Sequence, residues 1–412
     1  MATATFIKKP QRLRRLRQGP LGAHLELFSA RLLAEGHCKQ SAWRNIRVVD
    51  DFGRWLARRG IVVGDIDEAV VNRYMAFRVR YRHPFLSDRP ALNRFLAVLR
   101  EEALIAPQRL PHLSADEQIV ADFRHHLREQ GGYAPRTIIT HLPTLRRFLA
   151  EHCKSGPRGL SRLVAADIVS FVAHHAPHQS ARSTSRMCWT LRSFLRYLRY
   201  KDLISIDLAS AVPSVRTWRF ASLPRYLARG EVQKVLDAID RSTSLGRRDY
   251  AVLLLLARLG LRASEVATLC LQDIDWQDGV LTIRGKARQR AQMPLPSEVG
   301  AAIGDYLQHG RPRSQSRRVF LREWAPQIGF ASAASVTMIA RTALDRAQVD
   351  TPRKGAHVFR HTLATTLLRS GASLTQIGQL LRHRSQDSTR IYAKVDIEAL
   401  RGLAMRWPGG VS

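Results

Sequence analysis

The sequence predicts a mainly α-helical fold with one small antiparallel β-sheet in the second half of the chain. Through the first half, apolar residues recur at intervals of three and four, which places them on one face of a helix. In the second half, the segments "GVLTIRGK" and "AQMPLP" flank a polar turn and predict the two strands of a hairpin. With 412 residues, of which 45% are hydrophobic, the chain can form two or three domains with separate cores.

The charge balance indicates a polyanionic partner. Lysine and arginine number 66 against 34 acidic residues, a formal net charge of +32. Nucleic acid is the first candidate, because each cation laid against a phosphate releases condensed counterions. A basic surface without a partner and an anionic membrane surface are weaker alternatives. The four cysteines show no paired spacing, and we see no signal peptide or membrane-length apolar run, so we expect a soluble cytoplasmic protein associated with the nucleoid.

Five segments are expected along the chain. They are a basic flexible arm (1–20), an extra helical module (21–110), a second helical module (111–211), a linker (212–225) and a C-terminal domain (226–412). The arm is rich in arginine and lacks acids, which fits an organellar transit peptide, and a flexible DNA-contacting arm or a plain disordered tail fits equally well. The linker is predicted from its two prolines and its alternating small and basic residues.

The two helical modules are expected to be a diverged repeat. Residues 36–60 align with residues 132–156 at a constant offset of 96, which matches a turn glycine and a run of apolar positions. Chance similarity between two amphipathic helices is the alternative. Pro143 lies within the second copy and is expected to kink or interrupt its helix.

The C-terminal domain is predicted to be mostly helical around the hairpin. Its expected helices cover 231–239, 249–259, a segment starting near Ala263, and then about 333–347, 358–370, 374–382 and 387–403. The last of these could pack on its own domain or on a neighbouring protomer.

Six residues of this domain can carry chemistry. They are Arg262, Lys286, His357, Arg360, His383 and Tyr392. Taken singly, each has an ordinary explanation, such as a salt bridge between Arg262 and Glu265 or a solvated turn lysine. Tyr392 is less ordinary, because it lies in the polar stretch "HRSQDSTRIYAKV", where a ring has little apolar surface to bury.

The order and spacing of these residues resemble the catalytic domain of the tyrosine site-specific recombinases, the phage integrase family. "RDYAVLLLLARLGLRASEVATLCLQDID" resembles the first family signature and carries its arginine and supporting acid. "HVFRHTLATTLLRSGASLTQIGQLLRH" resembles the second signature, and "STRIYAKV" supplies the tyrosine nine positions after the last histidine. Two departures are Arg382, where the family commonly has glycine, and Asp207 with Leu208, where Asn-Pro often follows. The extra module at 21–110 has no place in the minimal family architecture.

The resemblance implies a site-specific recombinase or integrase of a mobile element that acts through a 3′-phosphotyrosyl intermediate and uses no cofactor. Residues 111–211 would be its core-binding DNA-binding domain, and the protein would clamp double-stranded DNA and form a tetramer on two synapsed sites. Partner recombinases could be required. The alternatives are a type IB-like topoisomerase, a hairpin telomere resolvase and a catalytically silent accessory DNA-binding protein.

The resemblance also implies a role for each of the six residues. Arg262 and Arg360 would hold the phosphate, Lys286 would protonate the leaving oxygen, and Tyr392 would attack phosphorus. His357 would assist proton movement at the tyrosine, and His383 would hydrogen-bond a phosphoryl oxygen. The polar setting of Tyr392 predicts a ring on a short mobile segment and not one packed in a core.

Overall fold

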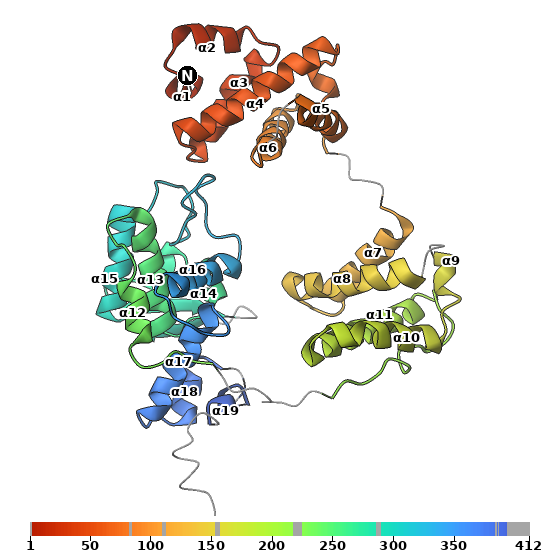
Figure 1. Ribbon diagram of the computed structural model, residues 1–412, viewed down its shortest axis with the longest axis vertical. Coiled ribbons are helices and arrows are strands. Elements are labelled where there is room, and N and C mark those ends of the chain that lie inside the picture. The colour runs from red at the N-terminus through yellow and green to blue at the C-terminus, as the bar shows by residue number, and fades with distance from the viewer. Residues whose placement is uncertain are drawn as a thin grey trace, which may run out of the picture. The chain divides into compact units, whose positions relative to one another are not determined.

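The computed structural model describes residues 2–81, 85–108, 113–152, 157–216, 225–285, 290–383, 385 and 387–393. As predicted, the described chain is mostly helical (Figure 1) and contains a small antiparallel sheet, which has three strands. It divides into two compact units, one of residues 109–221 and one of residues 1–108 with 222–412. Among the described helices, none combines the length and apolarity that crossing a membrane requires.

The N-terminal module has its own hydrophobic core. Its elements are α1 (Ala2–Phe6), α2 (Pro10–Arg17), α3 (Gly22–Ala34), α4 (Lys39–Arg58), the 3-10 turn η1 (Val63–Asp65), α5 (Glu68–Tyr81) and α6 (Asp88–Glu101). The expectation of a flexible arm at 1–20 is wrong, because this segment forms α1 and α2. Phe6, Ile7 and Leu16 are buried in the core, and the Thr3 hydroxyl donates to Ser29 Oγ at 3.0 Å. The sequence did not predict these two helices because the apolar residues that anchor them are few and lie in a segment rich in arginine.

The second module is also helical. It contains α7 (Ala115–Glu129), α8 (Pro135–His152), α9 (Pro157–Leu160), α10 (Ala165–His175), the 3-10 turn η2 (Ala176–His178) and α11 (Ala181–Tyr200). Pro143 lies inside α8, and the helix continues through it, so the expected interruption does not occur. The proline removes one backbone donor, but Leu142, Leu145 and Phe148 bury the same helix face on both sides of it and keep the helix in register.

The C-terminal domain carries the sheet. Its helices are α12 (Glu231–Asp237), α13 (Ser244–Arg258), α14 (Ala263–Thr268), η3 (Leu271–Asp273), α15 (Ser297–Asp305), the π-turn η5 (Tyr306–Gly310), α16 (Ala333–Arg346), α17 (Ala356–Arg369), α18 (Leu374–Leu380) and α19 (Asp387–Ala393). The predicted hairpin is β2 (Val280–Arg284) with β3 (Arg290–Pro294), and β1 (Ile274–Asp275) adds a short third strand in the order β1-β2-β3. Much of the linker and the chain after 393, including the rest of the predicted last helix, lies outside the described residues.

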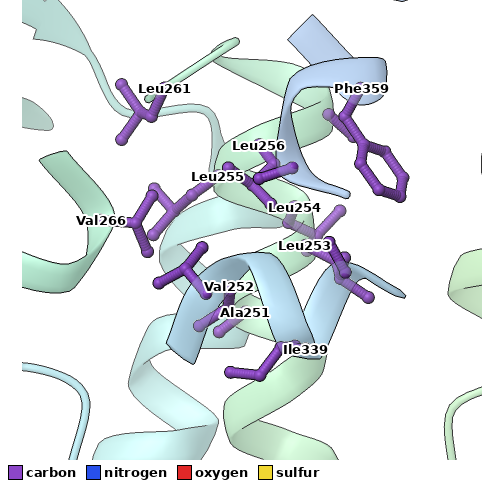
Figure 2. Packing of buried hydrophobic residues seen from close by; sticks show 14 of the residues in the cluster. Ala251, Val252, Leu253, Leu254, Leu255, Leu256, Leu261, Val266, Ile339 and Phe359 are labelled. Carbon is purple, nitrogen blue, oxygen red and sulfur yellow. The ribbon is translucent and has the colours of Figure 1, made fainter. Parts of the chain in front are cut away.

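Helix α13 is the central element of this domain. Its residues Ala251 to Leu256 are all buried, so neighbouring elements cover the helix on every side. Among the side chains around it are Val266 of α14, Ile339 of α16 and Phe359 of α17 (Figure 2). Because α14 and α17 pack in one core, the residues at their starts are held in fixed positions.

Candidate active site

Arg262 is fixed by the turn between α13 and α14. Gly260 has a φ of +57°, which turns the chain sharply after α13. Arg262 then precedes α14, where its backbone N–H donates to Glu265 Oε2 and its Nη1 donates to Oε1, both at 2.8 Å. The predicted salt bridge therefore exists. About a third of the Arg262 side chain (36%) stays exposed, so the guanidinium also remains available to a ligand.

Glu265 is a buried carboxylate that holds two arginines. Besides Arg262, it accepts a hydrogen bond from Arg382 Nη2 at 2.9 Å. Burial by itself would raise the pKa of Glu265. The Arg262 backbone N–H and the guanidinium charges of Arg382 and Arg262 outweigh burial, so the pKa lies below its usual value. Glu265 is therefore an anchor for cations and not a proton donor at neutral pH.

Arg360 lies on α17 with only 5% of its surface exposed. Its Nη1 donates to the Gly260 carbonyl and its Nη2 donates to the Leu381 carbonyl. Burial, followed by the nearby charge of Arg262, lowers the pKa of Arg360 to about 10. A buried guanidinium whose hydrogen bonds go to two neutral carbonyls favours a further anion beside it.

The two predicted histidines lie near both arginines and are held neutral. Desolvation, followed by the charges of Arg360 and Arg262, lowers the pKa of His357 and lowers that of His383 to about 4. His383 Nδ1 lies 2.7 Å from the Thr389 hydroxyl, which fixes the ring against α19. Neutral imidazoles can accept or donate a proton without adding to the local positive charge.

Tyr392 is packed in a core, so the expectation that its ring lies outside a core is wrong. Its residue is 1% exposed and forms a small cluster with Ala364, Ile377 and Leu381. The ring lies parallel to that of His383, with 6.3 Å between centroids and 6° between planes. The polar residues around Tyr392 in the sequence do not indicate an exposed ring, because α19 is amphipathic. Thr389 and Tyr392 lie one turn apart on its buried face.

A second histidine on α17, His361, was not among the predicted site residues. Its Nδ1 lies 3.0 Å from the Tyr392 hydroxyl, and desolvation with the charges of His357 and Arg360 lowers its pKa to about 4. The sequence did hold a signal for it, since His361 follows His357 by four residues and therefore shares its helix face. The structure thus gives the tyrosine hydroxyl a neutral imidazole as its direct partner.

Five of the six predicted residues therefore lie in one cluster. The guanidinium charges of Arg360 and Arg262 act on the pKa of Tyr392, although burial dominates and raises it. Lys286 lies outside the described residues, between the ends of β2 and β3. A tyrosine hydroxyl, two neutral histidines and two arginines form a set that can bind a phosphodiester and move a proton from a nucleophile.

Two family patterns match the chain. The one described as "Phage integrase family" covers residues 225–398, and the one described as "Phage integrase, N-terminal SAM-like domain" covers residues 120–201. The first spans all five described site residues and His361. Residues before 120 are outside both matches.

Several known proteins resemble the chain. The integrase/recombinase y4rA of Sinorhizobium fredii is 43% identical over 406 residues, 98% of both chains. The tyrosine recombinase XerC of Oceanobacillus iheyensis is 30% identical over 297 residues, which is 70% of this chain and 95% of the relative.

Solved structures share the fold. XerH bound to palindromic difH in a post-cleavage complex has a TM-score of 0.57 and 18% identity, and covers 77% of this chain and 89% of its own. A lambda integrase (75–356) dimer bound to a COC' core site has a TM-score of 0.51 and 15% identity, with 67% and 94% coverage.

Proposed function

The chain belongs to the phage integrase family of tyrosine recombinases, enzymes that cleave and rejoin DNA strands, and on this basis we propose that Tyr392 is its nucleophile in site-specific recombination. The observation that carries the proposal is the contact of the Tyr392 hydroxyl with His361 Nδ1, at 3.0 Å, beside Arg262 and Arg360. A phenol with an ordinary pKa near 10 is ionised to only about one part in a thousand at pH 7. Nucleophilic attack therefore needs a base at the hydroxyl.

In the first step, the Tyr392 oxygen attacks phosphorus and the bond from phosphorus to the deoxyribose 5′-oxygen breaks. The phenolic proton passes to His361, a neutral imidazole that lies 3.0 Å from the hydroxyl and has an unprotonated nitrogen to receive it. Lys286 donates a proton to the departing 5′-oxygen, which would otherwise leave as a strong base. The product is a 3′-phosphotyrosine and a free 5′-hydroxyl, so the bond energy is conserved without ATP.

Arg262 and Arg360 stabilise the charge that builds up on the non-bridging oxygens. Losing one such donor typically costs about 10² to 10³ in rate. Arg360 is buried and fixed by two carbonyls, so it needs little reorganisation as the charge develops. His357 and His383 complete the site as neutral hydrogen-bonding partners of the phosphate oxygens.

The burial of Tyr392 makes the described arrangement a resting state. With 1% exposure, Tyr392 admits a phosphodiester only after α19 shifts on α18, and the shift has to be small enough to keep the hydroxyl within reach of His361. This requirement protects the enzyme from cleaving DNA before its site is assembled. The reverse reaction, in which a 5′-hydroxyl of another strand attacks the phosphotyrosine, completes strand exchange.

The wider proposal is an integrase of a mobile element, associated with the nucleoid, that clamps double-stranded DNA and acts as a tetramer on two synapsed sites. The relatives described as integrases and recombinases favour this activity over a topoisomerase or a telomere resolvase. A catalytically silent accessory role is disfavoured because every described site position holds a residue of the type that strand cleavage requires.

The test is a nicked suicide duplex made from DNA that flanks the encoding element. The wild-type protein should form a covalent adduct that survives denaturing electrophoresis, and Tyr392→Phe should form none. A relative known to be active on its own site serves as the positive control. An adduct of undiminished yield with Tyr392→Phe would sink the proposal.

A further inference from the structure

The N-terminal module repeats the helix order of the second module. Helices α3, α4, α5 and α6 correspond to α7, α8, α10 and α11, and the single turn η1 corresponds to α9. The longest helix of the first module, α4, has 20 residues, and its counterpart α8 has 18. The turns before these two helices each use a glycine with positive φ, Gly36 at +78° and Gly132 at +61°. The match therefore extends beyond the two helices that the sequence alignment covered.

The same aromatic contacts recur in the two cores. Phe28 of α3 meets Phe95 of α6 edge to face, with 5.4 Å between centroids and 82° between planes. Phe123 of α7 meets Phe194 of α11 in the same way, at 5.2 Å and 73°. Two amphipathic helices that match by chance have no reason to share this contact.

A second aromatic pair links the other two helices of each module. Phe52 of α4 lies 5.0 Å from Tyr74 of α5, and Phe148 of α8 lies 5.2 Å from Phe171 of α10. An apolar stripe on the last helix also repeats. It consists of Leu92, Phe95, Leu96 and Leu99 in the first module and of Leu191, Phe194, Leu195 and Leu198 in the second. The offset grows from 96 at α4 to 99 at α6, as expected when the loops between helices change length.

The first module adds a basic surface of its own, which we call the basic ridge. It consists of the exposed residues Lys8, Lys9, Arg12, Arg14, Arg15 and Arg17, together with Arg44 and Arg47 of α4. Helix α2 contacts α4 through Arg12, whose guanidinium is 4.9 Å from the centre of the Trp43 ring. No acidic residue occurs between positions 1 and 25. The ridge is therefore a concentrated positive surface on a folded support.

Repulsion between the cations of the basic ridge destabilises the folded module unless an anion neutralises them. Like charges three or four residues apart destabilise a helix, and α2 carries four arginines in eight residues. Among the described residues, Lys8, Arg14 and Arg47 form no ion pair or side-chain hydrogen bond. Because α2 is anchored by buried Leu16, its cations are presented on a fixed backbone, which lowers the ordering cost of binding phosphates.

We propose that residues 21–108 form a second SAM-like domain and that the basic ridge binds the backbone of double-stranded DNA beyond the segment held by residues 111–412. Duplex DNA fits better than other polyanions, because the enzyme's own substrate brings a continuous row of phosphates to the protein. The ridge reads no base sequence in this role. It adds affinity that depends on salt and extends the bound stretch of DNA.

The experiment compares two triple variants of the full chain, each also carrying Tyr392→Phe to prevent cleavage. The ridge variant is Lys8→Gln, Arg14→Gln, Arg47→Gln, and among the described residues none of these side chains forms an ion pair or a side-chain hydrogen bond. The matched control is Arg58→Gln, Arg73→Gln, Arg80→Gln, which removes the same charge from exposed positions at the far end of α4 and on α5. Circular dichroism melts verify that both variants fold.

Fluorescence anisotropy measures the affinity for a long flanked duplex as a function of salt, and hydroxyl-radical footprinting measures the protected length. We expect the slope of log affinity against log salt to fall by about 2 to 3 in the ridge variant, because each phosphate contact contributes about 0.9. Its footprint should shorten, while the control keeps both quantities.

Equal losses in the two variants would mean that only net charge matters, and unchanged binding by the ridge variant would remove DNA as its partner. Either result overturns the proposal. So does a ridge variant that binds DNA normally but loses binding to vesicles containing phosphatidylserine. Adduct formation by Tyr392 in the suicide assay is a separate readout, so failure here leaves the proposed reaction standing.

Discussion

Arg382 shows how one residue can depart from a family preference and still support the site. It occupies the position where glycine is common in the family, and its φ is +53°. For a residue with a side chain, the left-handed region costs about 1 to 2 kcal/mol. The side chain offsets this cost by bonding Glu265, and the Arg382 carbonyl accepts a hydrogen bond from Arg262 Nη2 at 3.3 Å.

Substituting Arg382 separates its backbone cost from its side-chain gain. Both Arg382→Ala and Arg382→Gly should be less stable than the parent, because Glu265 loses one of its two cations in a buried place. We expect the glycine variant to be more stable than the alanine variant by about 1 kcal/mol, since only alanine retains the strained φ. Urea unfolding followed by circular dichroism measures the difference, and equal stabilities would show that the backbone here carries no strain.

The buried histidines make stability depend on pH. His361 and His383 have pKa values of about 4 in the folded chain against an ordinary 6.5. Between these values the unfolded chain binds more protons than the folded chain, so the free energy of unfolding increases with pH. The contribution of the two histidines to stability is fully present above about pH 6.5 and is lost as the pH falls toward 4.

This dependence can be assigned to one side chain. We expect His361→Gln, which cannot titrate, to reduce the loss of stability between pH 6.5 and 4.5, as measured by melting temperature. The exposed His309, replaced in the same way, is the control. A His361 variant with the pH dependence of the parent would contradict the assignment.

At the level of elements, the sequence predicted long periodic segments well and short ones poorly. Apolar spacing predicted the hairpin and the helices α13, α16, α17 and α18. The structure confirms these elements. Strand β1 has only two residues, too few for any alternation to show. Helix α15 was missed because small residues and glycine, "SEVGAAIGD", hide its buried face. Tertiary packing decides both cases, and the sequence does not display it directly.

The packing of α19 on α18 sets the position of Tyr392, the proposed nucleophile. A Cβ placed on Gly378 of α18 would lie 3.0 Å from the Thr389 hydroxyl oxygen, so even alanine crowds α19. We expect Gly378→Ala to loosen α19 and to raise hydrogen exchange across residues 387–393 by roughly tenfold, which corresponds to about 1.4 kcal/mol in the closing equilibrium.

A matched control exists in α15. A Cβ on Gly304 meets nothing within 4 Å, so Gly304→Ala should leave α19 unchanged and stabilise its own helix by up to about 1 kcal/mol. Unchanged exchange in Gly378→Ala would mean that α19 is not held by this contact. For Gly378→Ala we expect both faster hydrogen exchange across residues 387–393 and faster formation of the covalent DNA adduct.

For the whole molecule, the chemistry was predictable from sequence while its arrangement was not. The types and order of Arg262, His357, Arg360, His383 and Tyr392 indicated a strand-transfer site, and the +32 net charge indicated a nucleic-acid partner. The burial of Tyr392, its contact with His361 and the folded N-terminal helices depend on contacts between distant segments. Such contacts arise from packing, which local spacing does not encode.

The central claim is that Tyr392 forms the covalent bond to DNA. Mass spectrometry of the trypsin- and nuclease-digested adduct tests it directly, since it identifies the residue that carries the nucleotide. We expect a nucleotide linked through its 3′-phosphate to the peptide that contains Tyr392, with the mass stable to hydroxylamine as a phosphotyrosyl bond should be. A nucleotide on any other residue, or a link through a 5′-phosphate, would contradict the account.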